Sequence, residues 1–127
     1  MKTLRQIMRH GFIFTHQRTA TVADACRTMA AHNVGIVAVV DGERLCGVFS
    51  ERDVVRRVVD RRLEAARTRL GDVMTSDLVV ADVDEDYQSA MSKMDQANIR
   101  HLPVVSGDRF ISMLSIRDLM RVAIEDR

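Results

Sequence analysis

The chain has 127 residues, of which 46% are hydrophobic and 29% charged, and its formal net charge is +1. These values are typical of a globular protein, and so small a net charge provides no general attraction to nucleic acid or to an anionic membrane. No apolar run approaches the roughly 20 residues that a membrane span needs, and Met1–Gln6 lacks the apolar core of a secretory signal. We therefore expect a cytoplasmic protein with no nucleic-acid or membrane partner.

The first half of the chain predicts the order strand, helix, strand, strand, helix. The run Phe12–Phe14 is typical of a short opening strand, and apolar residues recur at helical spacing behind a capping Thr21. Two β-branched runs, 36–40 and 45–49, are joined by an Asp-Gly turn and predict adjacent strands. A final amphipathic helix begins at Ser50.

The second half predicts the same five elements. Leu78–Val80 is the opening strand, a helix follows Asp86, and runs 102–105 and 110–114 are the paired strands before a helix that begins at Ser115. The connection 60–70 is rich in Arg and Ala and has neither Gly nor Pro, which predicts a helical extension.

The two halves are copies of one unit. A shift of 65 residues lays 19–60 over 84–125 without a gap and gives 11 identities in 42 positions, where chance would give roughly three. The sequence therefore predicts an α/β (α+β) protein of two repeats, each a small sheet packed with two helices, with 1–68 as the first repeat, including the amino-terminal segment and a linker helix, and 69–127 as the second.

Catalytic and metal-binding patterns are missing from the sequence. No G-x-S-x-G, H-E-x-x-H, Walker or G-x-G-x-x-G motif occurs, so we expect no enzyme activity. Cys26 and Cys46 stand inside apolar patterns and are interpreted as buried small hydrophobic residues. The four histidines, His10, His16, His32 and His101, have no metal-ligand spacing, so no metal site is predicted.

The most faithfully repeated feature is a strand-to-helix junction, Ser50-Glu51-Arg52-Asp53 and Ser115-Ile116-Arg117-Asp118, here named the Ser50 corner and the Ser115 corner. A helix amino terminus with Ser and Arg offers donors to phosphate, and Asp can accept ribose hydroxyls. The alternative is a capping box, in which Ser and Asp satisfy only the helix's own backbone. Capping alone does not explain why Arg recurs in both copies.

These motifs, together with Asp72-Val73-Met74-Thr75, the strand entries Asn33-Val34-Gly35-Ile36 and Asn98-Ile99-Arg100-His101, and the Gly47-Val48-Phe49 run, resemble a tandem pair of cystathionine-β-synthase (CBS) domains. Such a pair, a Bateman module, has its stand-alone form in bacteria. The resemblance implies pseudo-twofold-related repeats with two shared nucleotide clefts. One cleft would use Ser50, Arg52, Asp53, Thr75, Val80, Arg100 and His101, and the other Ser115, Arg117 and Asp118 with Val34, Gly35 and Ile36.

The resemblance further implies a non-catalytic regulatory module, an energy or metabolite sensor that binds AMP, ADP, ATP or an NAD-type dinucleotide, with S-adenosylmethionine as a lesser candidate. It also implies a homodimer through the helices after Ser50 and Ser115, and an unidentified regulated protein. Two departures, Ser112 where the first copy has Gly47 and Arg9 where the second has Thr75, predict unequal clefts, with the Asp53 cleft occupied first. The alternative function is a structural protein-interaction domain with vestigial clefts.

Overall fold

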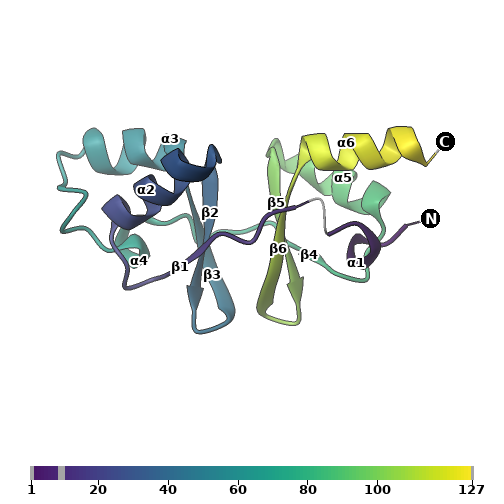
Figure 1. Ribbon diagram of the computed structural model, residues 1–127, viewed down its shortest axis with the longest axis horizontal. Helices are drawn as coiled ribbons and strands as arrows, with labels where there is room; N and C mark the ends of the chain where they lie inside the picture. The colour runs from purple at the N-terminus through teal and green to yellow at the C-terminus, as the bar shows by residue number, and fades with distance from the viewer. Residues whose placement is uncertain (1, 9–10, 127) are drawn as a thin grey trace. The chain divides into compact units, whose positions relative to one another are not determined.

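The computed structural model describes residues 2–8 and 11–126, which form two compact units (Figure 1). The 14–78 unit is continuous in sequence, whereas the 79–126 unit also includes the described residues up to Ile13. The short helix that begins each predicted repeat therefore packs in the unit formed mainly by the other repeat. In Figure 1 the purple helix α1 (Leu4–Ile7) lies in the same unit as the green and yellow elements.

The 14–78 unit has a three-stranded sheet. Strand β1 (Thr15–Gln17) runs parallel to β2 (Ile36–Asp41), which pairs antiparallel with β3 (Arg44–Ser50). The helices of this unit are α2 (Val22–His32), α3 (Glu51–Asp53), which continues into the π-helix η2 (Val54–Val59), and α4 (Leu70–Val73).

The 79–126 unit repeats this plan. Strand β4 (Ala81–Asp82) runs parallel to β5 (His101–Ser106), which pairs antiparallel with β6 (Arg109–Ser115). Its helices besides α1 are α5 (Tyr87–Ala97) and α6 (Ile116–Glu125). The register shift in the central pair falls between Val39 and Val40 in one unit and between Val104 and Val105 in the other, which are equivalent positions.

Several identities between the copies have a backbone cause. Asn33 and Asn98 end α2 and α5 in the left-handed conformation, with φ of 53° and 54°, which Asn tolerates better than most residues. Gly42 and Gly107 occupy the turns between the paired strands with φ of 64° and 66°, where a Cβ would be strained. The chain therefore keeps these four residues for local geometry.

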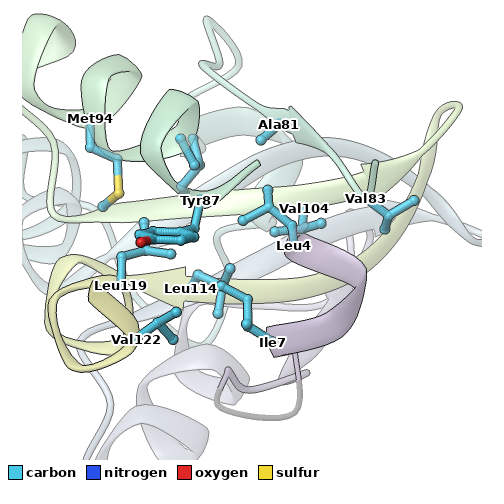
Figure 2. Packing of buried hydrophobic residues seen from close by; sticks show 12 residues of the cluster. Leu4, Ile7, Ala81, Val83, Tyr87, Met94, Val104, Leu114, Leu119 and Val122 are labelled. Carbon is cyan, nitrogen blue, oxygen red and sulfur yellow. The ribbon is translucent and has the colours of Figure 1, made fainter. Parts of the chain in front are cut away.

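Each unit has its own hydrophobic core. In the 79–126 unit, Leu4 and Ile7 of α1 pack with Tyr87 of α5 and with Leu119 and Val122 of α6 (Figure 2). The core of the 14–78 unit is formed by Val22, Ala25, Met29, Val37, Val39, Phe49, Val58, Leu70 and Val73. Cys26 and Cys46 are half-buried and pack against this second cluster. The short helices α1 and α4 are thus core elements, each closing the unit in which it is packed.

The predicted α/β class, the two repeats and the helices behind Thr21, Asp86, Ser50 and Ser115 are confirmed. The opening strands were predicted at the wrong positions, because β1 and β4 lie about three residues later than Phe12–Phe14 and Leu78–Val80. The side chain of Phe14 packs against the core and its carbonyl accepts from the Ala38 N–H at 3.1 Å, but strand β1 begins only at the next residue. Short edge strands tolerate polar sequences such as Thr-His-Gln.

The predicted helical extension over 60–70 is also wrong. Residues 60–68 form turns and irregular backbone, and Arg62 has a φ of 59°, which a right-handed helix does not allow. The backbone carbonyls of Ala65 and Thr68 accept hydrogen bonds from the N–H groups of Ala23 and Val22 at 3.0 and 2.9 Å. The first turn of α2 lacks intrahelical partners for these donors, so a tertiary contact overrides the helical propensity of the connection.

Candidate functional site

The Ser50 corner forms a complete capping box where β3 passes into α3. Asp53 Oδ2 accepts hydrogen bonds from the Ser50 backbone N–H at 3.0 Å and from Ser50 Oγ at 3.1 Å. The Asp53 N–H donates in return to Ser50 Oγ at 3.3 Å. The Asp53 carboxylate is buried, with 8% of the residue exposed. A buried charge of this kind requires several donors.

The second carboxylate oxygen of Asp53 faces two further groups. Thr75 Oγ1 donates to Oδ1 at 3.4 Å, and Arg57 Nε lies 3.5 Å from the same oxygen. Thr75 is held there by a two-way backbone pairing with Val48, in which both N–O distances are 2.9 Å. The structure therefore brings together Ser50, Asp53 and Thr75, three residues that the sequence assigned to one cleft.

The Ser115 corner has the same box with fewer partners. Asp118 Oδ2 accepts from the Ser115 backbone N–H at 2.8 Å, and the Asp118 N–H donates to Ser115 Oγ at 3.1 Å. Asp118 is only half-buried and forms no ion pair within residues 2–8 and 11–126. The position equivalent to Arg57 is Val122, which lies in the core. More of the acceptor capacity of Asp118 is therefore available to an added ligand than that of Asp53.

Arg52 and Arg117 occupy the first turns of α3 and α6 and are both exposed. Among the described residues neither forms an ion pair. Each therefore adds a solvent-accessible guanidinium beside the positive end of a helix dipole, an arrangement that favours an anion.

The entry to each central strand lies beside the corner of the same unit. The Gly35 carbonyl accepts from the Glu51 N–H at 3.0 Å, and Ile36 is the register partner of Ser50. The Arg100 carbonyl accepts from the Ile116 N–H at 2.8 Å in the same way. Val34, the residue before Gly35, is half-buried, whereas the Arg100 side chain is exposed.

His101 pairs with Ser115 in the sheet register and contacts the edge of Phe12, with ring centroids 6.1 Å apart. Burial lowers the pKa of His101, the negative charge of Asp118 raises it, and the positive charge of Arg100 lowers it. Because burial is the largest of these effects, the neutral imidazole is favoured. His101 then offers one ring donor and one ring acceptor to a ligand.

Val80 precedes β4, and its carbonyl accepts from Lys93 Nζ at 3.0 Å. Lys93 also forms an ion pair with Glu85 at 2.7 Å. Each of the two residue sets expected from the sequence draws on both units, so the composition of each set stays a prediction. Within one unit the structure groups Val34, Gly35, Ile36, Ser50, Arg52, Asp53 and Thr75, and within the other Val80, Arg100, His101, Ser115, Arg117 and Asp118.

The departure at Gly47 and Ser112 has a packing cause. A Cβ at Gly47 would lie 2.4 Å from Met74 Sδ, 2.8 Å from Met74 Cγ and 3.0 Å from the Thr75 carbonyl oxygen. In the other unit Ser112 is buried and its Oγ donates to the Met8 carbonyl at 3.3 Å. The other departure, Arg9, lies outside the described residues.

Exposed apolar side chains lie at equivalent positions of two helices. Val55 and Val59 on η2, and Met120 and Ile124 on α6, are between 52% and 64% exposed. On the same two helices, Val58 and Leu119 belong to the cores, and Val54 and Ala123 are half-buried against them.

Sequence reasoning missed Arg57. Its spacing of four residues from Asp53 on a predicted helix was an available signal, because side chains at i and i+4 face each other. The residues at the equivalent position, Arg57 and Val122, differ between the copies, so the repeat gave that position no weight.

Comparison with known proteins identifies the fold family. The profile of the CBS domain matches residues 4–60 and again residues 70–125. The chain belongs to the CBS-domain family. In sequence it is 33% identical over 111 residues to the mitochondrial CBS domain-containing protein CBSX3 of Arabidopsis thaliana, which covers 84% of this chain. The chain spans about half of that relative, 54% of its length, and about a fifth of several others.

Solved structures agree. A protein with CBS domains from Burkholderia ambifaria is 31% identical, with a TM-score of 0.85 over 99% of this chain and 96% of that one. CBSX2, solved in complex with AMP, has a TM-score of 0.80 over 99% of this chain and 98% of that one, and at 20% identity this likeness shows the fold alone. CBS-domain proteins of this kind are generally regulatory, and the relatives named here carry no enzymatic name.

Residues 2–8 and 11–126, which the structure describes, contain neither a membrane-spanning helix nor a cluster of metal ligands. No helix in those ranges combines the length and the apolar character that crossing a bilayer requires. No three side chains of His, Cys, Asp or Glu gather there in a way that could hold a metal ion.

Proposed function

We propose that this pair of CBS repeats is a non-catalytic regulatory module that binds an adenine nucleotide through its two Ser-x-Arg-Asp corners. The observation that carries the proposal is the repeated geometry, in which a carboxylate, a serine and an exposed arginine stand at the start of α3 and again at the start of α6. The carboxylate suits ribose hydroxyls and the arginine suits phosphate. Capping alone would leave Arg52 and Arg117 without a role.

The proposed ligands are AMP, ADP, ATP or an NAD-type dinucleotide, with S-adenosylmethionine as a lesser candidate. AMP is the first choice for a test because CBSX2, which has this fold, was solved with it. The two sites use the residue sets given by the sequence, one with Asp53 and one with Asp118. Arg100 and His101 give the Asp53 set more groups that can donate to phosphate, so it is proposed as the tighter site.

The module is further proposed to act as a homodimer and to pass nucleotide occupancy to a regulated protein. The exposed apolar pairs, Val55 and Val59 in one unit and Met120 and Ile124 in the other, support this part, because they occupy equivalent positions of the two repeats on helices that follow the two corners. A ligand at a corner would then act on the helix that carries the contact. The proposed setting is the cytoplasm, where the two free cysteines stay reduced.

One observation favours the alternative, a structural interaction domain with vestigial sites. Both capping boxes are complete without any ligand, since Ser50 and Asp53, and Ser115 and Asp118, satisfy each other. A box of this kind needs no nucleotide to explain it.

A thermal-shift panel separates the two functions. AMP, ADP, ATP, NAD, NADH and S-adenosylmethionine are each added to the full chain, with adenine-free ribose 5-phosphate as the control. A nucleotide at about 100 times its dissociation constant adds about 2.7 kcal/mol to the free energy of unfolding, so the proposal predicts a clear rise in Tm with at least one adenine nucleotide. No rise with any of them favours the interaction domain.

A further inference from the structure

Arg57 lies on η2 and contacts three groups of the 14–78 unit at once. Its Nη1 donates to the carbonyl oxygens of Val73 at 3.2 Å and Met74 at 2.8 Å, and its Nε lies 3.5 Å from Asp53 Oδ1. Val73 is the last residue of α4, where helix carbonyls have no intrahelical partner. One guanidinium therefore joins the carboxylate of the Ser50 corner to the end of α4.

Met74 connects the end of α4 to Thr75. The hydrogen bond from Arg57 to the Met74 carbonyl therefore fixes the direction in which the backbone enters Thr75. On one side Thr75 pairs with Val48, and on the other the Met74 carbonyl is held by Arg57. Gly47 leaves the space that the Met74 side chain fills. The Thr75 hydroxyl is thereby held within 3.4 Å of the Asp53 carboxylate.

In the other unit, a different residue holds the chain that follows the short helix α1. Met8 is the counterpart of Met74, and its carbonyl accepts a hydrogen bond from Ser112 Oγ at 3.3 Å. The repeat with glycine at this strand position has Arg57 on its last helix, and the repeat with Ser112 has the buried Val122 there. The two units thus hold the residue that follows the short helix in different ways, one with Gly47 and Arg57 and the other with Ser112 and Val122. Among the described residues, a cation contacts the corner aspartate only in the unit that has Arg57.

We infer that Arg57 is a positioning residue, which holds Asp53 and Thr75 in the arrangement that the proposed nucleotide site requires; this inference rests on the proposed function. Arg57 acts through its contacts with Asp53 and with the chain before Thr75. The guanidinium is suited to this because its nitrogens donate in several fixed directions, whereas a lysine ammonium is a single point charge.

The test compares AMP and ATP affinity, measured by isothermal titration calorimetry, for the full-length wild type and the variants Arg57→Gln, Arg57→Lys and Arg56→Gln. Arg56 is an exposed arginine on the same helix and serves as the matched control. We expect Arg57→Gln to weaken binding by about tenfold, since it removes charge-assisted contacts, and Arg57→Lys to restore part of the loss. Arg56→Gln should bind as the wild type does.

Two further measurements separate positioning from general stability. Hydrogen exchange of the Thr75 amide should accelerate in Arg57→Gln and stay unchanged in Arg56→Gln. In an Asp53→Asn background, Arg57→Gln should weaken binding by less than in the wild type, because contacting residues that act together are not additive.

Each remaining outcome contradicts a defined claim. Wild-type affinity in Arg57→Gln, or a loss of unfolding free energy with affinity retained, overturns the positioning role and leaves the proposed function intact. A wild type that binds neither AMP nor ATP contradicts nucleotide binding itself, and the positioning role fails with it; the exchange measurement then identifies Arg57 as a structural clamp alone.

Discussion

Gly47→Ala is the sharpest test of how the 14–78 unit positions Thr75. The added Cβ would lie 2.4 Å from Met74 Sδ and 3.0 Å from the Thr75 carbonyl oxygen, both closer than an ordinary contact. The Met74 side chain must rotate out of its packing against the core, and the Thr75 backbone must shift by a few tenths of an ångström. Overpacking of this kind costs about 1–3 kcal/mol, which for a domain of this size lowers Tm by roughly 3–10 °C.

The assay is chemical denaturation of the wild type, Gly47→Ala and Gly35→Ala. Gly35 is the matched control, because a Cβ there would meet only the Glu51 carboxylate at 3.6–3.8 Å, an ordinary contact. Its replacement should change the free energy of unfolding by less than about 1 kcal/mol, since alanine also restricts the unfolded chain. Equal stability of the two variants would refute the packing explanation for Gly47.

Three further predictions concern His101, the aspartates of the two corners and the exposed apolar side chains of η2. Burial lowers the pKa of His101, so the unfolded chain takes up a proton at higher pH than the folded protein. The free energy of unfolding should therefore fall as pH drops below about 6.5. This fall should be smaller in His101→Gln, and a pH profile of His101→Gln equal to that of the wild type would contradict the burial effect. Asp53→Ala should lower the free energy of unfolding by about 2–3 kcal/mol and Asp118→Ala by about 1 kcal/mol. The loss is larger at Asp53 because it accepts more hydrogen bonds and faces Arg57. Equal losses in chemical denaturation would show that these extra contacts do not stabilise the fold. Light scattering at micromolar concentration should give a dimer mass for the wild type and a monomer mass for Val55→Asp, and a monomeric wild type would remove the proposed dimer.

Much of the fold could be predicted from the sequence because each helix cap and each turn between paired strands occurs twice, at equivalent positions of the two repeats. Asn33 and Asn98 mark the helix ends, Gly42 and Gly107 the turns, and identity between the copies selected positions where the backbone requires a particular residue. Helices behind capping residues were predicted for the same reason, since a capping box is a local arrangement that sequence alone specifies.

The errors arose where tertiary contacts override local preference. The connection over 60–70 has a helical composition, yet its carbonyls cap α2 instead. The opening strands are short and polar, so apolar periodicity placed them too early. At the candidate site, the box of Ser50 and Asp53 was visible in the sequence, whereas the role of Arg57 depends on the end of α4, a short helix 16 residues further along the chain, which no periodicity connects to it.

Nucleotide affinity of the two-corner variant tests the central claim most directly. Asn at the third position of a capping box keeps a side-chain oxygen that accepts from the serine backbone N–H but lacks the charge, so the Asp53→Asn/Asp118→Asn variant should keep its fold and lose ribose binding. Calorimetric titration with AMP should give a measurable dissociation constant for the wild type and a value at least about tenfold higher for the double variant. Equal affinity in the two proteins would contradict the assignment of the corners, and no binding of any adenine nucleotide by the wild type would contradict the function itself.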